Sequence, residues 1–224
     1  MDDAAATSRI ALLAGATGLV GHALLPLLLS GKRYRRVHAL LRRAAPQVQA
    51  GRKLQVHQVD FARLPALAAV DDAYIALGTT IKAAGSEAAF RRVDFDFVVN
   101  TARAARAAGA TRLAVVSALG ADASSRVFYN RVKGEMEAAV AQLGYESIVI
   151  ARPSLLLGDR AALGQPVRKA EVWGVRLLGP LSLIVPRGLR PIHARAVAGA
   201  LLTATLAAKP GVRILKSGAM QAQA

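Results

Sequence analysis

The stretch Ile10-Ala-Leu-Leu-Ala-Gly15-Ala-Thr-Gly18-Leu-Val-Gly21 decides the fold that we predict for this chain. A short apolar run, typical of a buried parallel strand, ends at Gly15, and a helical pattern begins at about Leu19. Gly15 permits a tight turn, Gly18 lets backbone N–H groups approach a pyrophosphate, and Gly21 lets the helix pack close to the strand. The spacing is Gly-x-x-Gly-x-x-Gly rather than the more common Gly-x-Gly-x-x-Gly. It predicts a dinucleotide-binding turn, with a plain glycine turn into a buried helix as the alternative.

Length and composition are those of one α/β domain. With 224 residues, 54% hydrophobic and 20% charged, the chain can build a full core and is not a disordered sequence. The net charge of +16 suggests a nucleic-acid partner. The basic residues are scattered, however, and only 4% of residues are aromatic, so we expect adhesion to polyanions at low salt and no specific nucleic-acid binding. The absence of cysteine excludes disulfides and thiolate chemistry, and we predict no metal site.

The apolar segment 10–29 is similar to a signal peptide or a membrane anchor, since it contains no Asp, Glu, Lys or Arg. Three glycines and Pro26 interrupt it, and Asp2 and Asp3 make the preceding region acidic. No Ala-x-Ala cleavage site follows. We therefore interpret the segment as a core strand and a buried helix. The expectation is a soluble, cytoplasmic protein that does not bind a membrane.

Strands and helices alternate along the rest of the chain. Apolar runs predict strands at 36–41, 54–59, 73–77, 113–116 and 147–151, and helical patterns predict helices at 86–108 and 127–142. The inner face of the first of these helices is expected to carry Phe90, Val93, Phe97, Thr101 and Ala104. Alternation of this kind predicts a doubly wound parallel sheet, a Rossmann fold, in a single domain that spans residues 1–224.

The pattern changes after Gly158. Residues 158–193 combine glycines, prolines and the only tryptophan of the chain, and we interpret them as a small irregular segment that faces the substrate. A helix over 194–207 and a short strand over 212–215 are expected to follow. Residues 217–224 are predicted to form a frayed tail.

Three polar residues are candidates for proton-transfer chemistry. Tyr129 and Lys133 stand four residues apart in a predicted helix and therefore share one face. A lysine ammonium near a phenol stabilises the phenolate form. Ser117 follows the strand 113–116, at the edge of the sheet where active sites of such folds lie, and can bind the same substrate oxygen. A surface tyrosine and a solvated lysine are the alternative, but the dinucleotide loop favours a catalytic set of Ser117, Tyr129 and Lys133.

The sequence resembles an atypical, extended-like short-chain dehydrogenase/reductase. More closely, it resembles the Tat-interacting-protein oxidoreductase family and its bacterial relatives, over roughly residues 10–207. The glycine loop is one part of this resemblance. The other parts are Leu77-Gly78-Thr79-Thr80, Arg92-Val93-Asp94, Gly120-Ala121-Asp122 with Ser124-Ser125, Tyr129-Asn-Arg-Val-Lys133-Gly134-Glu135, and Arg152-Pro153 with Leu156-Leu157 and Gly158-Asp159-Arg160.

The resemblance implies a role for each matching residue. Ser117 would hold the substrate carbonyl, Tyr129 would be the general acid/base, and Lys133 would hold the nicotinamide ribose and polarise Tyr129. Many members of the superfamily carry an asparagine on the long helix, where this chain has Asp94. Asp94 would either contact Lys133 through water or lie on a solvated helix face.

The same resemblance implies a cofactor-binding set. In the glycine loop it comprises Gly15, Thr17, Gly18, Leu19 and Val20. Further along the chain, Asp60 would sit beside the adenine, Leu77, Gly78 and Thr79 would contact the adenosine side, and Arg152, Pro153 and Ser154 would flank the nicotinamide.

Arg42 and Arg43 bear on the choice of cofactor. An acidic residue after the second strand would bind the ribose 2′-hydroxyl and repel a 2′-phosphate. No acid occupies this place, and two arginines suit a phosphate, although they could also be ordinary solvated side chains. We therefore expect NADP (NADPH) as the cofactor.

The sequence thus predicts an NADP-dependent oxidoreductase that transfers a hydride between the nicotinamide and a small-molecule carbonyl or alcohol substrate. One alternative is an NADP-binding regulatory or scaffold protein without turnover. A lesser alternative is a nucleotide-sugar epimerase, for which about sixty-six residues after Gly158 are few. The sequence leaves open whether the protein forms a homodimer or binds a protein partner.

Overall fold

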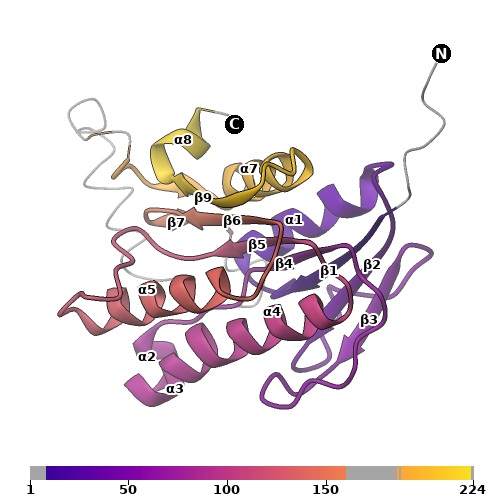
Figure 1. Cartoon of the computed structure of the whole chain (residues 1–224), viewed down its shortest axis with the longest axis horizontal. Helices are drawn as coiled ribbons and strands as arrows, with labels where there is room; N and C mark the ends of the chain where they lie inside the picture. The colour runs from indigo at the N-terminus through magenta and orange to yellow at the C-terminus, as the bar shows by residue number, and fades with distance from the viewer. Residues whose placement is uncertain (1–8, 160–185, 187, 223–224) are drawn as a thin grey trace.

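Seven parallel strands form the central sheet of the computed structural model, which describes residues 9–159, 186 and 188–222 (Figure 1). Neighbouring strands pair in parallel throughout. The order across the sheet is β3 (Leu54–Gln58), β2 (Tyr34–Leu41), β1 (Arg9–Ala14), β4 (Asp72–Ile75), β5 (Arg112–Val116), β6 (Ser147–Arg152) and β9 (Gly211–Lys216). The order reverses between β1 and β4, and open α/β sheets bind ligands beyond the carboxyl ends of the strands at such a point.

Helices cover both faces of the sheet (Figure 1). Helices α1 (Leu19–Ser30) and α7 (Ala194–Leu206) pack on one face, and α4 (Phe97–Ala107) and α5 (Phe128–Ala141) pack on the other. Strand β1 contributes alternate residues to the two cores, Leu13 to that of α1 and α7 and Leu12 to that of α4 and α5. The doubly wound Rossmann fold predicted from the sequence is therefore confirmed.

Several short elements complete the described part of the chain. Helices α2 (Ile81–Ala84) and α3 (Glu87–Arg91) and the π-helical turn η1 (Arg92–Asp96) connect β4 to α4. Strands β7 (Leu156–Leu157) and β8 (Ile192–His193) pair in parallel, and α8 (Ser217–Gln221) follows β9. Among the described helices, none is both long enough and apolar enough to cross a membrane.

The prediction of a frayed tail is wrong for Ser217–Gln221, which form α8. Met220 lies in the core beside α7, and Ser217 is also buried. The Ser217 hydroxyl is 2.9 Å from the Ser154 hydroxyl, which ties this helix to the end of β6. The predicted irregular segment 158–193 lies mostly outside the described residues, and at its end Ile192–His193 forms β8.

Of the five residues predicted for the inner face of the long helical segment, Phe90 and Thr101 are buried as predicted, but the other three are only partly buried. Asp94, Val98 and Ala105 are buried, whereas Val93, Phe97 and Ala104, each one position earlier, are only partly buried. The cause is the π-helical turn, in which the Phe97 amide donates to the carbonyl of Arg92, five residues back. A π turn adds one residue to the helical repeat, so the side chains after it change face.

Backbone packing at two glycines fixes the turn between β1 and α1. A Cβ on Gly15, whose φ is +93°, would lie 2.5 Å from the Ala76 carbonyl oxygen after β4, and a Cβ on Gly21 would lie 2.1 Å from the Gly15 carbonyl oxygen. A Cβ on Gly18 would meet nothing closer than 3.4 Å, the Gly15 carbonyl oxygen. Gly15 and Gly21 are thus required by the fold itself, whereas nothing among the described protein atoms requires glycine at position 18.

We predict that Gly21→Ala destabilises the protein and that Gly18→Ala does not. Overpacking typically costs about 1–3 kcal/mol, and here the obstacle is a backbone carbonyl that cannot rotate away. Gly18 has φ −84° and ψ 166°, a conformation that alanine adopts freely. Urea unfolding of both variants measures the difference in the free energy of unfolding. Equal stability of the two would contradict this account of the turn.

Candidate functional site

A cavity of about 920 Å³ opens at the carboxyl ends of β1, β4 and β5. Its volume is in the range of small-molecule and cofactor sites. The glycine loop, the segment after β4, the residue after β5 and one face of α5 meet there. Of the residues predicted from the sequence, the lining includes Gly15, Thr17, Gly18, Leu19, Val20, Arg42, Arg43, Leu77, Gly78, Thr79, Ser117, Tyr129 and Lys133.

The glycine loop fits a bound pyrophosphate. Gly18 is the N-cap of α1, no side chain caps this helix end, and the first turn carries no acidic residue. The amides at the start of the helix are thus left for an anion, which the helix dipole also favours. The space that a Gly18 side chain would fill adjoins the cavity. The sequence argument for Gly18 therefore agrees with the geometry.

Ser117 lies directly after β5 with its side chain buried. Its hydroxyl oxygen has no hydrogen-bond partner among the described residues, although it borders the cavity. A buried hydroxyl without a partner is costly, and such groups are rare outside functional sites. The hydroxyl is thus available to a ligand oxygen.

Tyr129 and Lys133 reach the cavity from α5, as their spacing predicted. The Tyr129 ring is half-buried and packs against Phe90, with the ring centroids 5.2 Å apart. The Lys133 ammonium is buried and forms an ion pair of 2.7 Å with the Asp94 carboxylate. Burial by itself disfavours the charged lysine, but Asp94 and Tyr129 more than compensate, so the pKa of Lys133 is raised above its ordinary value.

Four predicted cofactor residues do not line this cavity. The Asp60 carboxylate accepts a hydrogen bond of 2.9 Å from the amide of Ala62, in the turn that follows β3. The guanidinium of Arg152 is held by Glu137 of α5, with Nη2 and Oε2 2.6 Å apart. Pro153 is buried, and the Ser154 hydroxyl donates to the Arg190 carbonyl. The roles given to these four residues stay predictions.

The structure also adds lining residues that sequence reasoning missed. They belong to three groups: the loop after β2, the short helices α2 and α3 with η1, and single apolar side chains at the rim. These are Ala44, Ala45, Pro46, Gln47, Ala83, Ala84, Ala89, Arg92, Val93, Phe97, Phe61 and Leu156. Asp94, singled out from the sequence, also borders the cavity, and it contacts Lys133 directly rather than through water. Helix α2 had a sequence signal, because the Thr80 side chain caps it and Gly85, with φ +87°, ends it.

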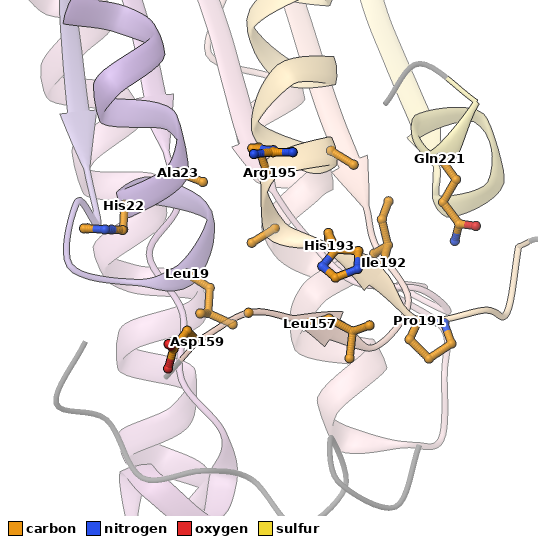
Figure 2. Close-up of a pocket in the computed structure, with 13 residues that line it drawn as sticks. Leu19, His22, Ala23, Leu157, Asp159, Pro191, Ile192, His193, Arg195 and Gln221 are labelled. Carbon is orange, nitrogen blue, oxygen red and sulfur yellow. The ribbon is translucent and has the colours of Figure 1, made fainter. Parts of the chain in front are cut away.

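A second cavity, of about 660 Å³, lies between the first turn of α1 and the start of α7 (Figure 2). His22 and Leu19 border it from α1, and His193 and Arg195 border it from the other side. Leu19 borders both cavities. The described residues contain no cluster of three or more potential metal ligands.

Comparisons with known proteins relate the chain to an NAD(P)H-binding family. Residues 15–156 match the model of a protein family described as NAD(P)H-binding. The chain is 35% identical to the protein HTATIP2 of Rattus norvegicus over 172 residues, which cover 75% of this chain and 69% of HTATIP2. It is 34% identical to the mitochondrial protein FMP52-1 of Scheffersomyces stipitis over 155 residues, 67% of this chain and 68% of that protein.

Solved structures with the same fold are more distant in sequence. MoeE5 in complex with UDP-glucose and NAD has a TM-score of 0.69 at 18% identity, covering 92% of this chain and 74% of MoeE5. ADP-L-glycero-D-manno-heptose-6-epimerase of Helicobacter pylori has a TM-score of 0.68 at 17% identity, covering 96% and 78%. At these identities the likeness shows the fold alone.

The relatives contradict the predicted cytoplasmic location. Among the relatives, the FMP52-1 protein of Scheffersomyces stipitis and the FMP52 proteins of Eremothecium gossypii and Candida albicans are named as mitochondrial. The glycines and Pro26 within 10–29 distinguish a core strand and helix from a membrane anchor, but they carry no information about the compartment.

The family resemblance is confirmed by the match over residues 15–156 and by the similarity to HTATIP2 and FMP52-1. The chain belongs to the NAD(P)H-binding family of Rossmann-fold proteins.

Proposed function

We propose that the protein is an NADP-dependent oxidoreductase of the short-chain dehydrogenase/reductase type, which interconverts a carbonyl compound and its alcohol. The observation that carries this proposal is the buried Ser117 hydroxyl, without a partner among the described residues, on the same cavity as Tyr129 and Lys133. A protein that only binds a dinucleotide needs the glycine loop but has no need of this set.

Each of the three residues has a definite task in reduction. The nicotinamide, when bound, supplies a hydride to the carbonyl carbon. The Ser117 hydroxyl donates a hydrogen bond to the carbonyl oxygen and orients it. Tyr129 donates its phenolic proton to that oxygen as the C=O π bond is lost, which gives the alcohol. Lys133 stabilises the phenolate that remains and binds the nicotinamide ribose, and the phenolate regains a proton from solvent.

Three features support NADP rather than NAD. Arg42 and Arg43 follow β2 and border the cavity, and their side chains are exposed. No hydrogen bond or ion pair ties either guanidinium to another described residue. The end of β2 carries no carboxylate that would repel a 2′-phosphate. The family description names both cofactors, so this choice rests on the arginines.

The test is incubation of the purified protein with NADPH and a panel of aldehydes and ketones, with nicotinamide absorbance as the readout. We expect consumption of NADPH with at least one carbonyl class, faster than with NADH. NADPH binding without turnover across a broad panel would overturn the enzyme proposal in favour of a regulatory or scaffold protein.

We predict that Gly18→Val abolishes NADPH binding while the fold persists. The valine side chain would occupy the space assigned to the pyrophosphate, and no described protein atom lies closer than 3.4 Å to its Cβ. Calorimetric titration with NADPH measures the affinity, and circular dichroism reports the fold. An affinity equal to that of the wild type would mean that the loop is only a turn.

We predict that Arg42→Ala weakens NADPH binding and leaves NADH binding nearly unchanged. A hydrogen bond to a charged group contributes about 1.5–3 kcal/mol, which corresponds to roughly ten- to a hundredfold in affinity. Arg103→Ala is the matched control, since Arg103 is exposed on α4 and does not border the cavity. Equal losses for the two cofactors would show that Arg42 does not bind the 2′-phosphate.

We predict different effects for Tyr129→Phe and Lys133→Met. Tyr129→Phe keeps the ring against Phe90 but removes the proton donor, so turnover should fall about 10²–10⁴-fold with little change in NADPH affinity. Lys133→Met should weaken both, because the ammonium serves the ribose as well as Tyr129. A carbonyl substrate reduced equally fast by the wild type and Tyr129→Phe would remove Tyr129 from the mechanism.

A further inference from the structure

Asp94 occupies a buried position in the wall of the cofactor cavity. Its carboxylate contacts groups from two other elements. Oδ1 is 2.7 Å from the Lys133 ammonium of α5, and Oδ2 accepts a hydrogen bond of 2.8 Å from the backbone amide of Thr79, in the segment after β4. The exposed fraction of the Asp94 side chain is 1%, and that of Lys133 is 4%. The ion pair is therefore shielded from bulk water, and its two side chains are held in a defined geometry.

The π-helical turn η1 brings Asp94 into this position. Phe90, Asp94 and Val98 are all buried, and they follow one another at intervals of four residues. A regular α-helix has 3.6 residues per turn, so a run of fours drifts around it, whereas the wider π turn keeps the three side chains on one side. The irregular turn thus places Asp94 on the inner side of the helix, between two buried apolar residues.

Both neighbours of the carboxylate are donors. The Thr79 amide and the Lys133 ammonium each need an acceptor, and a carboxylate offers one oxygen to each. An asparagine side chain has a single acceptor oxygen, and its NH₂ group would face one of the two donors. The buried lysine also needs a compensating negative charge, which an amide does not supply. The contacts therefore explain why an aspartate stands here.

The ion pair also shapes the cavity wall through Gly78. A Cβ on Gly78 would lie 3.2 Å from Asp94 Oδ1 and 3.9 Å from Lys133 Nζ. The backbone at Gly78 is therefore packed closely against the ion pair, and a side chain there would require the Asp94 carboxylate to move by a few tenths of an ångström. Gly78, Thr79, Asp94 and Lys133 all border the cavity, and Asp94 connects the segment assigned to the adenosine side to Lys133.

We propose that Asp94 is a positioning residue that fixes the Lys133 ammonium against Tyr129 and couples it to the Gly78–Thr79 wall of the cofactor site. This inference rests on the proposed function, which assigns Lys133 to Tyr129 and to the nicotinamide ribose. Asp94 itself transfers no proton and contacts no substrate. It makes cofactor binding and proton transfer depend on one arrangement of side chains.

The Asp94 charge also affects the protonation of Lys133. The charged and titratable groups that face Lys133 are Asp94 on η1 and Tyr129 and Glu137 on α5, and Glu137 is already paired with Arg152. Loss of the Asp94 charge would lower the pKa of the ammonium. The ammonium that serves Tyr129 and the ribose would then lose its proton at a lower pH.

The first experiment compares Asp94→Asn with Asp96→Asn. Asp96 lies on the same turn but is exposed and does not border the cavity, so the control removes the same charge without touching Lys133. In calorimetric titration with NADPH, we expect Asp94→Asn to weaken binding by roughly ten- to a hundredfold, since the ion pair that holds Lys133 in place is lost. Asp96→Asn should stay within about twofold of the wild type.

A double-mutant cycle followed by thermal unfolding, without cofactor, tests the pairing itself. Asp94→Asn should lower the Tm of the wild type, because it leaves a buried ammonium unpaired. In the Lys133→Met background the same substitution should raise the Tm, because it removes an unpaired buried carboxylate. A decrease of similar size in both backgrounds would overturn the proposed coupling of Asp94 to Lys133.

The pH profile of carbonyl reduction separates positioning from a merely structural role. We expect the alkaline limb of kcat to move to lower pH in Asp94→Asn, whereas a general loss of structure would reduce kcat at every pH by the same factor. An unmoved limb, or NADPH affinity equal to that of Asp96→Asn, would overturn the proposal. A wild-type protein that binds NADPH without turnover would overturn the oxidoreductase function, and the binding and unfolding results would still decide the role of Asp94.

Discussion

The site depends on the close approach of three backbone segments around Gly15. The end of β1, the first turn of α1 and the residue after β4 touch without intervening side chains, since a Cβ on Gly15 or on Gly21 would meet a carbonyl group at 2.5 or 2.1 Å. This contact places the uncapped start of α1 beside the Leu77–Thr79 segment, on the same cavity. The uncapped end of the helix and the Leu77–Thr79 segment are therefore fixed relative to each other by the fold itself.

The cationic side chains that border the cavity differ in their surroundings. Arg42 and Arg43 border it after β2 with exposed, positively charged side chains. On α5, Lys133 is buried and neutralised by Asp94. Exposed cations attract an anionic ligand from solution and are screened by salt, whereas the buried pair adds little long-range field but holds a definite geometry. The exposed arginines can thus attract an anionic ligand, while the buried pair presents fixed polar groups to it.

The sequence predicted the parts of this structure that local patterns encode. The strands around the glycine loop, the approach of Tyr129 and Lys133 on one helix face and the position of Ser117 after β5 all follow from periodicity and spacing. The π turn could not be predicted, because one extra residue in a helix leaves no distinct pattern, and it shifted the expected inner face from Val93 to Asp94. Likewise, the pairing of Arg152 with Glu137 joins separate elements, and the burial of Met220 comes from a helix of five residues.

The irregular turn and the unusual aspartate are best understood together. A helix with regular repeat would present a different residue to α5, and an asparagine at the correct place would leave one of two donors without an acceptor. Regular local structure is commonly broken at functional sites, where a specific contact outweighs the cost of the irregularity. Here the contact also constrains its neighbours: Lys133 needs the carboxylate, the carboxylate needs a counter-charge, and a side chain at Gly78 would press on the carboxylate. A change at any one of the three unbalances the other two, so the group behaves as a single unit.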